Sequence, residues 1–140
     1  MEGAAILGIA IDAVPLHIIE LINAYVATPP RDESQKVDNW TDRAVPLGAL
    51  WGQQMVRAFD WEWAEVVHHD HNDVHLAGVF NRERSLAVYP LHYVFGCLKN
   101  EVYPTILLAF NMLTAGKIPE LEAGGYVNLM DGVQHVVPPR

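Results

Sequence analysis

The spacing of hydrophobic and polar positions predicts four helices. In two long segments, 13–27 and 44–59, apolar residues return every three or four positions, as on the buried face of an α-helix. Two shorter segments of the same kind begin at Pro90 and Pro104, and proline is favoured in the first turn of a helix. Asp12 precedes the first segment and is expected to cap that helix.

Three strands are predicted between the second and third helices. Residues 61–69 and 74–80 alternate in polarity, and residues 85–89 form a short apolar run. The connecting segments, 70–73 and 81–84, have the polar composition of turns. This order predicts an α+β fold in which a three-stranded antiparallel meander packs with about four helices.

The register of the first two strands follows if their turn is tight. A turn centred on residues 71–72 places His68 opposite His75 and Trp63 opposite Phe80. In this register the two histidines are direct cross-strand neighbours.

With a second turn centred on residues 82–83, both faces of the predicted sheet are apolar. One face carries Ala64, Val66, Ala77, Val79, Leu86 and Val88. The other face carries Trp63, Val67, Leu76, Phe80, Ala87 and Tyr89. An antiparallel sheet with one wet side shows a polar face, so either helices cover both sides or one side is a partner surface. Trp63, Phe80 and Tyr89 are therefore candidate interface residues.

A further hairpin is predicted in the C-terminal tail. Two runs rich in strand-forming residues, 126–130 and 133–137, flank the dipeptide Asp131-Gly132. Asp-Gly between such runs strongly favours a two-residue turn.

The composition fits one domain. The chain has 140 residues, of which 51% are hydrophobic and 19% are charged, enough to bury one core. The single cysteine excludes a disulfide framework. The N-terminal apolar run ends at Asp12 with no Lys or Arg before it, unlike a signal peptide, so we expect a cytoplasmic protein. We divide the domain into an N-terminal helix within 1–27, a polar linker at 28–40 and an α+β core at 41–140.

The chain is acidic, with 9 Lys and Arg against 17 Asp and Glu and a net charge of −8. Nucleic-acid binding needs a basic stripe that displaces counterions from phosphates, and anionic membranes also attract basic segments. We therefore expect neither a nucleic acid nor a membrane as partner. The charge is compatible with a basic protein partner, or with solubility alone.

Four histidines and two aspartates lie within residues 68–75, a composition found in metal sites. If His68 faces His75, their Cβ atoms are about 5 Å apart. The two imidazoles could then share a divalent metal, with Asp70 or Asp73 as a third ligand. The alternative is a solvated turn rich in histidine, and this simpler interpretation is favoured, so we expect no cofactor.

Gly48 and Gly52 lie four residues apart on the second predicted helix, beside Trp51. Glycine costs a helix about 1 kcal/mol against alanine, so two glycines on one stripe indicate that another backbone comes close there. The functional alternative is a small ligand in a groove between this helix and the sheet.

The segment from Leu47 to Leu113 resembles a small bacterial domain family of unknown function. The matching motifs are a helix with Leu-Gly-x-x-Trp-Gly from Leu47, a strand with Trp-x-Trp-x-Glu-Val from Trp61, and Leu-Ala-Val-Tyr-Pro-Leu from Leu86 leading into a helix. The resemblance covers about half of the chain and its motifs are mainly apolar. It implies the α+β meander, and it transfers no activity or site.

These observations rank three functions. The first is a non-enzymatic module that binds a protein or itself, either as an immunity-type protein that neutralises a basic toxin or as a homodimer. The second is a small metal-dependent hydrolase that uses His68, His75 and a turn aspartate. The third is a small-ligand carrier with its pocket at Gly48 and Gly52.

Overall fold

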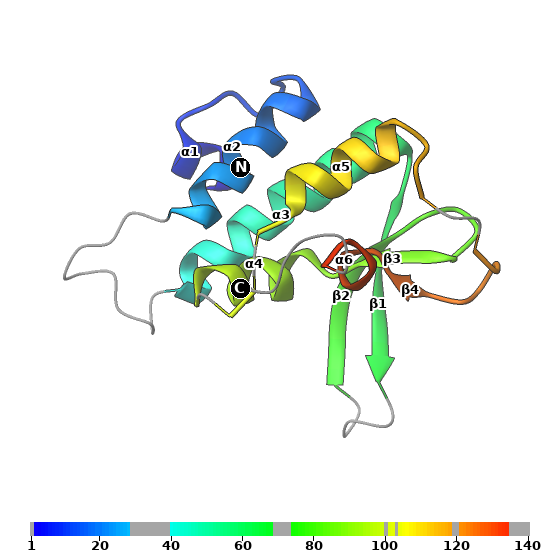
Figure 1. The fold of residues 1–140 in the computed structure, drawn as a ribbon. Helices are drawn as coiled ribbons and strands as arrows, with labels where there is room; N and C mark the ends of the chain where they lie inside the picture. The colour runs from blue at the N-terminus through cyan, green and yellow to red at the C-terminus, as the bar shows by residue number, and fades with distance from the viewer. Residues whose placement is uncertain are drawn as a thin grey trace.

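A computed structural model describes residues 2–28, 40–68, 74–99, 101–102, 104–118 and 121–134. The described helices are α1 (Glu2–Leu7), α2 (Pro15–Ala27), α3 (Trp40–Phe59), α4 (Pro90–Leu98), α5 (Ile106–Thr114) and α6 (Leu129–Gln134). The described strands are β1 (Glu62–His68), β2 (Val74–Phe80), β3 (Leu86–Val88) and β4 (Val127–Asn128). Helices α1 to α5 gather on one side, and the β1–β2 hairpin extends away from them (Figure 1).

The long helix α3 organises the core, because α1, α2 and α4 all contact it. Its apolar face buries the large side chains Leu47, Leu50, Trp51 and Met55. The polar side chain of Gln54 lies among them, fully buried. It donates a hydrogen bond to the Leu50 carbonyl (2.9 Å) and accepts one from Arg57 (2.7 Å), so its burial leaves neither end of the amide unpaired.

Helix α2 lies where periodicity predicts, but it begins differently. Its N-cap is Val14, which makes no side-chain capping bond, and Pro15 occupies the first turn. The prediction of Asp12 as the cap is therefore wrong. The carbonyl of Ala13 accepts a hydrogen bond from Arg57 of α3 (2.8 Å). This bond anchors the segment that precedes α2 to α3.

Helix α3 begins at Trp40, four residues before the expected start at position 44, and it includes Pro46. The short helix α1 falls in the N-terminal apolar run, which suggested no element. Most of the predicted linker, 29–39, lies outside the described residues. No helix in the described ranges is both long and apolar enough to cross a membrane.

The described strands form one sheet in the order β1-β2-β3-β4. The first three strands are antiparallel, as the sequence predicts, and β4 adds to β3 in parallel. The prediction of an α+β meander is thus confirmed, and the sheet is larger and mixed.

The predicted C-terminal hairpin is wrong. After two residues of strand, the chain turns into α6, whose Leu129, Met130 and Val133 are buried. These residues lie at i, i+1 and i+4, the spacing of a helical face. The Asn128 side chain accepts a hydrogen bond from the Met130 amide (3.1 Å) and so caps α6. The Asp131-Gly132 dipeptide therefore lies within a helix and not in a hairpin turn.

The predicted register is also wrong. In the first hairpin His68 pairs with Val74 and Val67 pairs with His75, a shift of one residue. Five residues separate the last paired positions, rather than the four of the predicted turn at 70–73. A shift of one residue turns the side chains of one strand to the other face, so Trp63 shares a face with Val79 and not with Phe80.

In the second hairpin Phe80 pairs with Ala87, a shift of two residues. The connection is longer than a two-residue turn because the Asn81 side chain organises it. Its carbonyl oxygen accepts hydrogen bonds from the amides of Ser85 (2.9 Å) and Leu86 (3.1 Å). Arg84 adopts a left-handed conformation (φ 57°) in the same loop.

Candidate functional site

The β1–β2 hairpin exposes much of its surface, because residues 62–67 of β1 are all exposed or half-buried. Strand β1 lies at the end of the sheet, and no described segment pairs with its outer edge. Toward the hairpin tip, Glu65, His75 and Ala77 are exposed and Val67 is half-buried. An edge strand of this kind presents unpaired backbone N–H and C=O groups to another chain.

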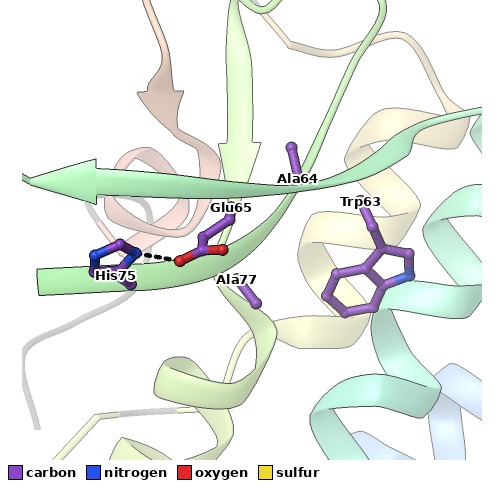
Figure 2. Close-up of a pocket in the computed structure, with 5 residues that line it drawn as sticks. All are labelled: Trp63, Ala64, Glu65, His75 and Ala77. Carbon is purple, nitrogen blue, oxygen red and sulfur yellow. Dashed lines mark hydrogen bonds and ion pairs between the residues drawn. The ribbon is translucent and has the colours of Figure 1, made fainter.

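One face of the hairpin forms a shallow hollow of about 480 Å³, lined by Trp63, Ala64, Glu65, His75 and Ala77. Figure 2 shows Glu65 and His75 reaching toward one another from neighbouring strands, with the Trp63 indole farther along, beside a helix. Glu65 Oε1 and His75 Nδ1 form an ion pair, and both side chains are largely exposed.

Trp63 joins the hairpin to the helical body. A Cβ atom placed on Gly52 of α3 would overlap the Trp63 indole and lie 3.0 Å from Val79. The glycine therefore makes room for the indole, which is still 38% exposed. This contact supports the base of the hairpin and leaves part of a large aromatic surface open to solvent.

Three ion pairs follow the hairpin from its base. Arg82 contacts Asp60 (2.7 Å), Arg84 contacts Glu62 (3.1 Å), and His75 contacts Glu65. Surface pairs of this kind contribute about 0–1 kcal/mol each. They balance the acidic side chains of β1 locally, and they leave those carboxylates accessible to a charged partner.

The histidine–carboxylate pair alone does not make a catalytic set. An imidazole oriented by a carboxylate can act as a general base, but covalent catalysis also needs a nucleophile within reach. The described residues that line the hollow carry no hydroxyl or thiol group.

The predicted metal site loses the geometry on which it rested. Because His75 pairs with Val67 and His68 pairs with Val74, the two histidines are not direct cross-strand neighbours. Asp70 and Asp73 lie outside the described residues. Within the described part of the chain, no group of three or more His, Cys, Asp or Glu side chains could hold a metal ion. Metal binding by the whole cluster stays a prediction.

The groove predicted at Gly48 and Gly52 is filled by protein. A Cβ atom on Gly48 would lie 2.8 Å from the backbone of Leu91, so this glycine marks the close contact of α3 with α4. Trp51 is 1% exposed and packs edge-to-face on Tyr93, with ring centroids 5.4 Å apart. The packing interpretation is confirmed for Gly48, while at Gly52 a side chain fills the space.

Of the other predicted interface residues, Phe80 lies inside the fold and Tyr89 is half-buried. Phe80 is 1% exposed, and the ring of Tyr89 meets it edge-on with centroids 6.2 Å apart. The Glu65–His75 pair was not predicted. Glu65 and His75 come together only because five residues separate His68 from Val74, which sets the register of the two strands. Nothing in the composition of this connection indicates its length.

Comparison of the chain with protein-family models, with curated proteins and with solved structures gave no match.

Proposed function

We propose that this chain is a non-enzymatic binding module that adds a strand of another protein to the outer edge of β1. The observation that supports this most is the position of β1 at the end of the sheet, on a hairpin that extends from the helical body (Figure 1). Strand addition to an exposed edge takes its affinity from backbone hydrogen bonds and its specificity from neighbouring side chains.

The side chains around this edge supply such specificity. Val66 and Val67 are half-buried on alternate faces of β1, and Trp63 offers an exposed aromatic surface supported by α3. Aromatic residues held rigidly beside an interface contribute much of the binding energy in protein complexes. A partner strand paired with β1 would cover part of the side chains of Val66, Val67 and Trp63.

The charge of the chain favours a basic partner over a second copy. The net charge is −8, and Asp60, Glu62 and Glu65 are exposed along the hairpin. Because these carboxylates are each paired with Arg82, Arg84 or His75, the preference comes from the net charge of the chain, which repels a second copy and attracts a basic strand. An immunity-type protein that neutralises a basic toxin would fit this description.

Exchange of backbone amide hydrogens in a captured complex tests the proposal. The tagged protein is used to isolate a stoichiometric partner from its native host, and exchange is compared in the free and bound protein. We expect β1 amides to gain protection on binding, while α5 amides do not. The variant Val66→Lys places a charge on the edge strand and should weaken the complex by about tenfold or more.

The matched control is Leu108→Lys, which changes an exposed apolar residue on α5 and should leave the affinity unchanged. Equal binding by Val66→Lys and the unmodified protein, or protection confined to the helices, would exclude strand addition at β1. A dimer at micromolar concentration in light scattering, with β1 protected, would replace the basic partner by a second copy.

A further inference from the structure

A second hollow, of about 330 Å³, lies where β2, α4 and α6 meet. Leu76 of β2 and Met130 of α6 are its apolar members, and Tyr89 and Tyr93 are its aromatic ones. Polar groups are contributed by His92, Asn128 and Asp131. Apolar and aromatic lining with a few polar groups is typical of small-molecule sites, and the volume is at the low end of their usual range of about 300–1,000 Å³.

The aromatic members of this hollow are held in place by the fold. A Cβ atom on Gly78 would lie 3.1 Å from the Tyr89 ring and 2.8 Å from the Phe80 ring. The absence of a side chain at Gly78 therefore leaves room for both rings. The Tyr93 hydroxyl accepts a hydrogen bond from the Thr105 amide and shares a second with the Thr105 hydroxyl, both at 2.9 Å. Rings fixed in this way form a preorganised surface.

The charge of the hollow is negative. Burial, opposed in part by its hydrogen bonds to Thr105, raises the pKa of Tyr93 to about 12. Burial and the neighbouring Tyr126 also raise the pKa of Tyr89, so both phenols are neutral at physiological pH. Asp131, which is exposed, is the one acidic side chain among the described residues that line the hollow. The chain around it carries a net charge of −8, which raises the local concentration of cations.

We propose that this hollow binds the ammonium group of a small organic cation, with Asp131 as the counter-ion and the Tyr89 and Tyr93 rings as its aromatic walls. A cation against aromatic faces gains about 0.5–2 kcal/mol, and a nearby carboxylate adds charge attraction. None of its lining residues belongs to β1, although Leu76 pairs with Val66 of that strand, so the site is distinct from the outer edge proposed for strand addition.

Binding of choline, compared with its neutral isostere 3,3-dimethylbutan-1-ol, tests the site. Both probes are titrated at pH 8 and low salt, where imidazoles are ordinarily neutral, and amide signals of residues around the hollow are followed by NMR. We expect saturable shifts with choline and about tenfold weaker binding of the neutral alcohol. Asp131→Asn should weaken choline binding by about tenfold, and Tyr89→Leu should weaken it further.

The matched control is Glu20→Gln, which removes an exposed carboxylate from α2, away from the hollow. This variant should bind choline as the unmodified protein does. Equal affinity for choline and the neutral alcohol, unchanged binding by Asp131→Asn, or no saturable shift with choline would each overturn the proposal. The NMR spectrum of each variant reports directly whether it is folded.

Discussion

At the scale of single residues, two glycines on α3 show how similar sequence features can serve different neighbours. Gly48 lies against the backbone of Leu91 and Gly52 lies under the Trp63 indole. The spacing of the two glycines indicates close contact at this stripe, and the structure contains it. The sequence does not say what approaches, because the neighbours are 43 and 11 positions away and their placement depends on the whole fold.

We expect Gly48→Ala to lower the free energy of unfolding by up to about 2 kcal/mol. The added methyl group would push α4 away, which costs about 1–3 kcal/mol, while alanine returns about 1 kcal/mol of helix propensity. Gly52→Ala should cost less, because the partly exposed indole of Trp63 can swing outward. Urea unfolding of both variants measures the difference. A Gly48→Ala protein about 1 kcal/mol more stable than the unmodified chain, the full gain in helix propensity, would mean that the two helices do not touch here.

At the scale of elements, helices and strand positions were largely predictable and strand register was not. Helix α2 and strand β2 lie within two residues of the segments that periodicity predicts, because that signal is local. The register depends on loop conformation, such as the Asn81 hydrogen bonds and the left-handed Arg84. An error of one residue was enough to pair His75 with the wrong neighbour and to place Trp63 on the wrong face.

The C-terminal tail shows a local signal overruled by tertiary packing. Asp131-Gly132 favours a hairpin turn, yet Leu129, Met130 and Val133 are buried on one side of α6. A hairpin would alternate these residues between two faces and expose part of this set. The burial of three large side chains therefore decides the conformation of the segment.

If Asn128 caps α6, Asn128→Ala should destabilise the protein by about 0.5–2 kcal/mol. Asn128→Asp keeps an oxygen that can accept the Met130 amide hydrogen and should retain most of the stability. Urea unfolding of the two variants, with amide exchange at Met130 and Val133, provides the measurement. Loss of stability in both variants alike would point to a role for Asn128 other than capping.

At the scale of the whole molecule, the fold divides into a packed body and a thin arm. Helices α2 and α3 each bury an apolar face, the inner end of β2 joins that core through Val79, and Phe80 is buried on the other face of the sheet. The outer half of the hairpin has exposed or half-buried side chains and pairs only with itself among the described residues. The projecting arm was not predictable, since the sequence pattern indicates only that both sheet faces carry apolar residues.

This division predicts that the hairpin opens before the body unfolds. Amides of residues 65–67 and 75–77 should exchange through a local opening, whereas amides of residues 47–55 in α3 should exchange only on global unfolding, since burial sets the cost of opening. Native-state exchange in rising urea separates the two processes by their dependence on denaturant. Val79 and Phe80 serve as the internal control, because they belong to the same strand but lie in the core. If the outer hairpin instead exchanges only with α3, the arm is part of the cooperative core. A partner strand would then meet a rigid template, and binding would protect the β1 amides without ordering the hairpin.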